Sequence, residues 1–259
     1  MQKITFRHCG DMGDIIFSLP AIRHFRDQGA TTELALDITG GKGKMSIYQA
    51  LPQRGYTKFN QKCYDFLKPL LEIQPYITRV FPETSDIIMP NVEYKDLNMF
   101  RNYVKFQNLT YSHLAAMHLE GDPVQYTKRW LEVGENNEEK YDVLMNRTLR
   151  SQGNHTFWES FIPYCIKEGK KIGFMGTDLE YQVICEVMEV DPAKLPRVIV
   201  SDALQMARLI DKCEMFASNE GLPGAIAIAL DHKLICEVNK TYPATVFRDK
   251  AETGQFMYI

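Results

Sequence analysis

The chain has 259 residues, of which 45% are hydrophobic and 24% are charged. These proportions are typical of globular proteins that bury a core, and the length allows one large domain or two small ones. The formal net charge of -3 gives the chain no basic surplus. This balance disfavours a general nucleic-acid binder, which usually carries an excess of lysine and arginine.

The cysteines and the apolar stretches indicate a protein of the cytoplasm. Six cysteines lie far apart without a C-x-x-C pair, so we expect reduced, mostly buried thiols and no zinc site. Polar Arg7 and His8 follow a short apolar run at the N-terminus, which is not a signal-peptide pattern. The longest apolar stretch, 225–230, is far shorter than the ~20 residues of a membrane span.

The first part of the chain predicts strand, turn, helix and strand in that order. The expected elements are a strand at 3–7, a glycine turn at 10–14, a helix at 15–26 and a strand at 33–38. Pro20 lies inside the predicted helix, where we expect it to kink the helix or delay its start. This order is typical of the opening of a Rossmann-like half.

The middle of the chain is less regular. It predicts a flexible basic loop at 40–44 and then further elements, namely a helix at 65–73, a strand at 77–81, and helices at 112–118 and 123–133. The charged segment 135–140 is typical of a linker. We therefore expect one domain at residues 1–138 and a second at residues 139–259.

The second half alternates strands and helices again. Strands are expected at 141–145, 171–175, 197–200, 213–217 and 233–238, and helices at 154–167, 179–190, 203–211 and 223–230. Such alternation predicts a mostly parallel sheet that is covered on both faces. The predicted fold class is therefore α/β with two Rossmann-like domains.

The first candidate site is the turn Gly10-Asp11-Met12-Gly13-Asp14. Ligands of open parallel sheets bind at the carboxyl ends of strands, and glycines let the backbone approach them closely. An ionised carboxylate at Asp14 suits a general base. The alternative is that Asp14 only caps the following helix.

The second candidate site follows the strand at 141–145. Arg147 and Arg150 lie three residues apart with Thr148 between them. Two guanidinium groups beside a hydroxyl suit a diphosphate. The alternative is a surface loop held by ion pairs.

The third candidate site is the turn of Gly176 and Thr177, with Glu180 in the helix that follows. Glu180 suits a pair of ribose hydroxyls as their hydrogen-bond acceptor. The alternative is a capping arrangement in which Thr177 or Asp178 starts the helix.

The fourth candidate site is the turn of Asn219, Glu220 and Gly221 before the helix at 223–230. Free backbone amides at a helix start bind anions. Because a carboxylate repels phosphate, we expect Glu220 to contact sugar hydroxyls. Elsewhere, Trp158 with Phe157 and Phe161 is expected to pack in a core or between the domains instead of stacking on a base.

These four sites, taken in order, resemble the bacterial heptosyltransferases, the glycosyltransferases of the ADP-heptose:lipopolysaccharide type. Residues 10–23 (GDMGDIIFSLPAIR) are similar to the family's opening "xGxxGDxxxxxPALR" segment, and residues 204–213 to its "LAxLIxxA" helix. Residues 216–227 (FASNEGLPGAIA) resemble its "xxSNDSGPMHLA" turn, and residues 174–180 its "LxGxxxE" segment. The resemblance spans both halves, but residues 40–135 match loosely or not at all.

The resemblance implies a GT-B fold, with two Rossmann-like domains and a cleft between them. It implies an acceptor side in the N-terminal domain and a nucleotide-sugar side in the C-terminal domain. It also implies an inverting glycosyltransferase that uses no catalytic metal and no cofactor, with a nucleotide-sugar of unknown base as co-substrate. The catalytic base falls on Asp14, and the acidic donor-site residue falls on Glu220.

The sequence departs from the family at two points. Ala225 stands where the family has histidine, and the family's lysine-bearing phosphate segment is not recognisable, so Arg147 and Arg150 would have to replace it. The donor and acceptor are therefore expected to differ from heptose and lipopolysaccharide. A non-catalytic nucleotide or glycan binder of the same fold is an alternative that these departures favour.

Short chains of this kind also resemble glycosyltransferase-like proteins of phages. This resemblance places the protein in the cytoplasm of a bacterium or of a phage-infected host cell. The acceptor is then expected to be a surface glycan or a modified DNA base. A DNA acceptor requires a basic wall, for which the candidates are Lys42, Lys44, Arg54, Lys58 and Lys62.

Overall fold

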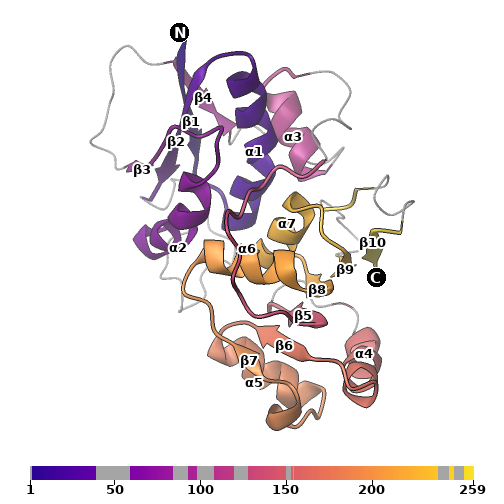
Figure 1. The fold of residues 1–259 in the computed structure, drawn as a ribbon. Helices are drawn as coiled ribbons and strands as arrows, with labels where there is room; N and C mark the ends of the chain where they lie inside the picture. The colour runs from indigo at the N-terminus through magenta and orange to yellow at the C-terminus, as the bar shows by residue number, and fades with distance from the viewer. Residues whose placement is uncertain are drawn as a thin grey trace. The chain divides into compact units, whose positions relative to one another are not determined.

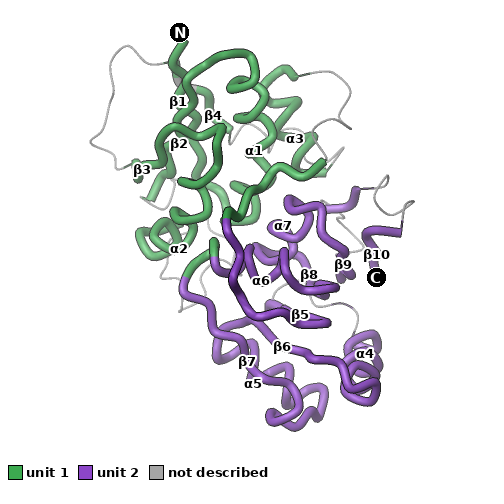
Figure 2. Tube along the Cα trace, in the orientation of Figure 1, with its two compact units in different colours: residues 1–134, 202–204 green, residues 135–201, 205–259 purple. Residues whose placement is uncertain are grey.

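The computed structural model describes residues 2–38, 59–83, 93–97, 108–119, 128–149, 153, 155–238, 245–247 and 254–259. The chain divides into two compact units, residues 1–134 with 202–204 and residues 135–201 with 205–259 (Figure 2). Each unit is built on one parallel β-sheet. The predicted α/β fold with two Rossmann-like halves is confirmed, and the predicted linker at 135–140 begins the second unit.

The first unit has a four-stranded sheet in the order β3-β2-β1-β4 (Figure 1). Its elements are β1 (Lys3–His8), α1 (Met12–Asp27), β2 (Thr31–Asp37), α2 (Gln61–Glu72), β3 (Arg79–Glu83), β4 (Glu93–Asp96) and α3 (Leu109–Ala116). The strand order reverses between β1 and β4. Ligands of open α/β sheets bind outside the carboxyl ends of the strands at such a switch point.

Helix α1 begins at Met12, so the prediction that Pro20 delays its start is wrong. All residues from Ile15 to Ile22 are buried, so this part of the helix is enclosed by the core on every side. Pro20 has no N–H to donate to the carbonyl of Ile16 one turn earlier. The indole Nε1 of buried Trp130 donates to that carbonyl at 3.1 Å. The helix therefore continues past the proline with its orphaned acceptor satisfied.

This substitute hydrogen bond predicts a coupling between positions 130 and 20. We expect Trp130→Phe to lower the free energy of unfolding by about 1–3 kcal/mol, because it leaves the buried Ile16 carbonyl without this donor. In the Pro20→Ala background the loss should be smaller, since the introduced alanine supplies the missing N–H. Urea unfolding of the four variants measures the coupling, and an equal loss in both backgrounds would refute this role of Trp130.

Of the helix predicted at 123–133, the structure describes residues 128–133, and these are not helical. Trp130 and Leu131 are buried there, so tertiary packing overrides the helical spacing. Strand β4 was not predicted, because three of its four residues are charged. It pairs with β1 at the edge of the sheet, where such residues are tolerated.

The second unit has a six-stranded sheet in the order β10-β9-β8-β5-β6-β7. Its elements are β5 (Val143–Asn146), α4 (His155–Lys167), β6 (Ile172–Met175), α5 (Asp178–Val187), a 3-10 helix (Pro192–Lys194), β7 (Arg197–Val198), α6 (Ala203–Lys212), β8 (Met215–Asn219), α7 (Leu222–Ala229), β9 (Leu234–Glu237) and β10 (Phe256–Tyr258). Counted from β5, this is the 3-2-1-4-5-6 order of doubly wound nucleotide-binding sheets. Its switch point lies between β5 and β8.

The core of the second unit contains Trp158, which is fully buried on α4, as expected from the sequence. The six cysteines are free and five of them are buried, also as expected. Burial raises the pKa of the Cys165 thiol to about 11 and that of Cys213 to about 12. Both thiols therefore stay protonated at neutral pH. Among the described residues, no helix is long and apolar enough to cross a membrane.

Candidate functional site

Asp14 lies in the first turn of α1, directly after the carboxyl end of β1. Its Oδ2 accepts a hydrogen bond from the backbone N–H of Asp11, the N-cap residue, at 3.3 Å. This is one arm of a capping box, so the capping alternative describes a contact that is present. The Asp14 side chain is only partly buried, and its role as a base stays a prediction. Gly13 lies within the same helical turn instead of in the preceding loop.

Position 10 requires glycine because a side chain there would collide with two neighbouring side chains. A Cβ at Gly10 would lie 2.3 Å from Cε1 of His8 and 3.0 Å from Oδ2 of Asp14. The Gly10 N–H also donates to Nδ1 of His8 at 2.8 Å. The imidazole, the glycine and the carboxylate are thus packed together, and His8 is a residue of this turn that no sequence motif indicates.

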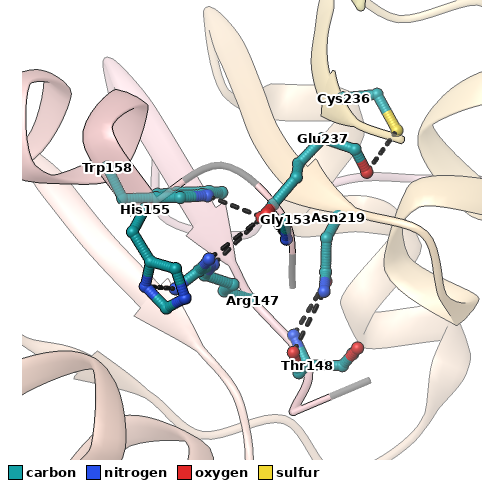
Figure 3. Close-up of polar contacts among 8 residues, drawn as sticks. All are labelled: Arg147, Thr148, Gly153, His155, Trp158, Asn219, Cys236 and Glu237. Atoms are coloured by element: carbon teal, nitrogen blue, oxygen red, sulfur yellow. Dashed lines mark hydrogen bonds and ion pairs between the residues drawn. The ribbon is translucent and has the colours of Figure 1, made fainter. Parts of the chain in front are cut away.

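The two turns at the switch point of the second sheet are joined by Asn219. This fully buried residue ends β8, and Thr148 follows β5. The Asn219 Oδ1 accepts from the backbone N–H of Thr148 at 2.8 Å, and its Nδ2 donates to the Thr148 carbonyl at 3.0 Å (Figure 3). A Cβ at Gly221 would lie 3.2 Å from Cγ2 of Thr148. The structure therefore brings three predicted site residues together, with Asn219 holding the loop.

We call the two hydrogen bonds between the Asn219 side-chain amide and the Thr148 backbone the Asn219 clasp. Because only an amide can make both bonds, we predict that Asn219→Asp destabilises the protein. The carboxylate still accepts from the Thr148 N–H, but it places a second oxygen against the Thr148 carbonyl and buries a charge. We expect a loss of about 3 kcal/mol in the free energy of unfolding. Urea unfolding checks this value, and a variant as stable as the wild type would show that the clasp contributes nothing.

Arg147 forms a buried ion pair with Glu237, the last residue of β9 (Figure 3). Its Nε and Nη2 lie 3.0 and 3.2 Å from the two carboxylate oxygens. Glu237, which is fully buried, also accepts from Nε1 of Trp158 at 2.8 Å and from the N–H of Gly153 at 2.5 Å.

The ion pair gives Arg147 a different partner from the predicted diphosphate. The alternative of a loop held by ion pairs describes a contact that is present, but the side chain of Arg147 is only 2% exposed, so the pair is buried and does not lie on the surface. The contacts hold the loop that contains Arg147 to β9, and binding of a diphosphate by Arg147 stays a prediction. Arg150 lies outside the described residues. In the sequence, Glu237 is marked only by being a single glutamate in an otherwise apolar strand.

Thr177 and Glu180 form a reciprocal capping box at the start of α5. The Thr177 Oγ1 accepts from the N–H of Glu180 at 3.3 Å, and the Glu180 Oε2 accepts from the N–H of Thr177 at 2.8 Å. The Gly176 carbonyl accepts from Nε of Arg197 at 3.2 Å. The capping alternative is therefore confirmed, while a ribose contact of Glu180 stays a prediction.

Glu220 lies between β8 and α7 and is partly buried. Its Oε1 accepts from Oγ1 of Thr245 at 2.9 Å. The N-cap of α7 is Gly221, which has no side chain with which to cap the helix, and Pro223 follows in the first turn. The amides at a helix start have no intrahelical acceptor and attract anions. A carboxylate and an anion-binding helix start are thus adjacent.

No protein-family model matches the sequence, and no curated protein matches it either. Solved structures do match. A glycosyl transferase of family 9 from Veillonella parvula DSM 2008 is 12% identical with a TM-score of 0.63, covering 98% of this chain and 88% of that one. E. coli ADP-heptose lps heptosyltransferase II is 11% identical with a TM-score of 0.63, covering 100% and 90%. E. coli heptosyltransferase WaaC with ADP is 12% identical with a TM-score of 0.57, covering 98% and 99%.

The chain has the fold of these three structures. The predicted GT-B fold is therefore confirmed, and a likeness of 11–12% identity establishes the fold alone. Another match, E. coli TibC, is described as an iron-containing dodecameric glycosyltransferase; it is 12% identical, with a TM-score of 0.60, covering 95% of this chain and 60% of that one. In the described part of the chain, no group of three or more His, Cys, Asp or Glu residues could hold a metal ion.

Proposed function

We propose that the protein is an inverting glycosyltransferase that moves a sugar from a nucleotide-sugar to a hydroxyl acceptor without a catalytic metal. The observation that carries the proposal is the placement of two carboxylates in the heptosyltransferase-like fold. Asp14 follows the central strand β1 of the first sheet, and Glu220 follows β8 beside the start of α7. Each residue lies just after the carboxyl end of a strand, where parallel sheets bind ligands. Each also lies in a segment that resembles a motif of the heptosyltransferases.

In the proposed reaction, Asp14 takes the proton of the acceptor hydroxyl as that oxygen attacks the anomeric carbon. The bond from this carbon to the diphosphate breaks, and the new glycosidic bond forms on the opposite face. The free amides at the start of α7 stabilise the negative charge on the departing diphosphate. Asp14 therefore holds the proton that the acceptor loses, and the nucleoside diphosphate leaves as an anion.

The donor side of the proposal is the switch point between β5 and β8. The Asn219 clasp fixes the Thr148 loop against the turn that leads into α7. Because Glu220 cannot favourably contact phosphate, we assign it to the sugar hydroxyls, with the diphosphate on the α7 amides. E. coli WaaC has been solved with ADP and with ADP-2-deoxy-2-fluoro heptose, so ADP-sugars are the first donors to test.

The proposed acceptor is a glycan hydroxyl. Four of the five basic residues on which a DNA acceptor depends, from Lys42 to Lys58, lie outside the described residues. A non-catalytic nucleotide binder is the second candidate. It is favoured by Ala225, a buried residue of α7 at the place of the family's histidine. Donor binding without turnover for any acceptor would support that candidate.

A thermal-shift screen against ADP, UDP, GDP and ADP-heptose tests the proposed donor class. A donor at 100 times its Kd should stabilise the fold by about 2.7 kcal/mol. For a chain of this size the melting temperature should then rise by several degrees. Nucleoside diphosphate release in the presence of candidate acceptors measures transfer. The absence of a shift with every nucleotide and nucleotide-sugar would contradict the proposal.

Glu220→Gln should keep the fold and impair donor use. Glutamine retains an oxygen that accepts from Thr245 but lacks the charge that strengthens hydrogen bonds from sugar hydroxyls. We expect the donor KM to rise, or kcat to fall, by about tenfold. Thr245→Val is the matched control, because it removes the hydrogen bond and leaves the carboxylate. If Glu220→Gln keeps wild-type KM and kcat, Glu220 does not contact the donor.

A further inference from the structure

Two buried histidines meet at the switch point of the first sheet. His8 ends β1, and His113 lies on α3, the helix that comes after β4 in the chain. Their Nε2 atoms are 3.2 Å apart. Nδ1 of His8 lies 2.8 Å from the N–H of Gly10, and Nδ1 of His113 lies 2.7 Å from the Leu109 carbonyl. Four groups thus form one chain of hydrogen bonds.

The ends of this chain determine where its protons lie. The Gly10 N–H can only donate, so Nδ1 of His8 must accept and carries no proton. The Leu109 carbonyl can only accept, so Nδ1 of His113 must carry a proton. The remaining contact is satisfied when Nε2 of His8 donates to Nε2 of His113. Both imidazoles are therefore neutral, in opposite tautomers, and another proton on either ring would break one of the three bonds.

The Gly10 end of this hydrogen-bond chain lies beside Asp14, the proposed base. The His8 ring and the Asp14 carboxylate both border the space that a side chain at position 10 would fill, since a Cβ there would lie 2.3 Å from Cε1 of His8 and 3.0 Å from Oδ2 of Asp14. The Asp14 Oδ2 in turn accepts from the N–H of Asp11, the residue after Gly10. Displacing the His8 ring would therefore move the two residues that set the position of the carboxylate.

We propose that His8, held in one tautomer by His113, is a positioning residue for the Asp14 carboxylate. It acts through the Gly10 N–H, and its contact with His113 links β1 to α3. The proposal rests on the function assigned to Asp14, but the hydrogen-bond chain itself does not. His113 belongs to the same hydrogen-bond chain, because its Nε2 accepts a hydrogen bond from the proton that His8 carries on Nε2.

The first test is nitrogen-15 NMR of histidine-labelled full-length protein at pH 7.5. We expect His8 to be protonated at Nε2 and His113 at Nδ1, with no imidazolium signal from either ring. A proton on Nδ1 of His8 would overturn the proposal, because that nitrogen could not then accept from Gly10. This measurement needs no substrate.

The second test distinguishes the role of the His8 Nδ1, which faces Gly10, from the role of its Nε2, which faces His113. In His8→Asn the side-chain oxygen takes the place of Nδ1 and still accepts from Gly10, whereas the longer side chain of His8→Gln reaches toward His113 instead. We expect amide exchange at Gly10 to be about tenfold faster in His8→Gln and to change by less than about threefold in His8→Asn. The Asp14 carboxyl carbon signal should shift in the glutamine variant only.

The catalytic readout uses release of ADP from ADP-heptose, or of the diphosphate from whichever donor the screen identifies. In His8→Gln we expect kcat to fall about tenfold with an unchanged donor KM, and in His8→Asn we expect most of kcat to be restored. His24→Gln, on the same helix as Asp14, is the control. Equal losses in both His8 variants, or no shift at Asp14, would refute positioning. If Asp14→Asn stays active, the proposed function fails, while the NMR results still decide whether His8 holds the turn.

Discussion

Asp14→Asn is expected to fold as the wild type does and to lose transfer by about 10²–10⁴-fold, the usual contribution of a general base. Asparagine has the same shape, and its Oδ1 can still accept from the Asp11 N–H, so the capping contact survives. The amide cannot take a proton from an acceptor hydroxyl at neutral pH. The measurements are donor turnover and the melting temperature of the variant.

Asp27→Asn is the matched control for this prediction. It makes the same change of charge at the exposed far end of α1 and should keep full turnover. Two outcomes would count against the assignment of Asp14. Unchanged turnover would place the base elsewhere, and a loss of turnover that only follows a lower melting temperature would reduce Asp14 to a helix cap.

Arg147→Met is expected to cause the largest loss of stability. It leaves the fully buried Glu237 carboxylate without its counter-charge, although the donors Trp158 and Gly153 remain. Breaking a buried pair in this way costs about 3–5 kcal/mol. The double variant Arg147→Met, Glu237→Gln should recover part of the loss, because a neutral amide replaces the uncompensated charge. Urea unfolding of the single and double variants measures both effects.

The same variants test whether Arg147 holds its loop to β9 or binds the diphosphate of the donor. If the arginine holds its loop to β9, the folded double variant should bind ADP with an affinity close to that of the wild type. A diphosphate contact would instead weaken binding by about 1.5–3 kcal/mol with little loss of stability. Calorimetric titration with ADP separates these outcomes, and the second would restore the role predicted from the sequence.

The sequence predicted the strand-helix alternation of the second unit because its strands are short apolar runs between turn residues. It missed β4, whose charged residues suit only an edge. Asp14 and Glu220 could be proposed as site residues from the sequence because both lie at glycine turns after strands. His8 and Glu237 could not, since a single polar residue in an apolar strand has no periodic signal. Their partners lie 105 and 90 residues away in the chain, and only the folded sheets bring them together.

The most direct test of the proposed function is a crystal structure with the nucleotide-sugar that gives the largest thermal shift. We predict the diphosphate on the amides that start α7, beside the carboxyl ends of β5 and β8, and the Glu220 carboxylate within hydrogen-bond distance of a sugar hydroxyl. A donor bound away from this turn, or Glu220 pointing away from a donor bound there, would contradict the account.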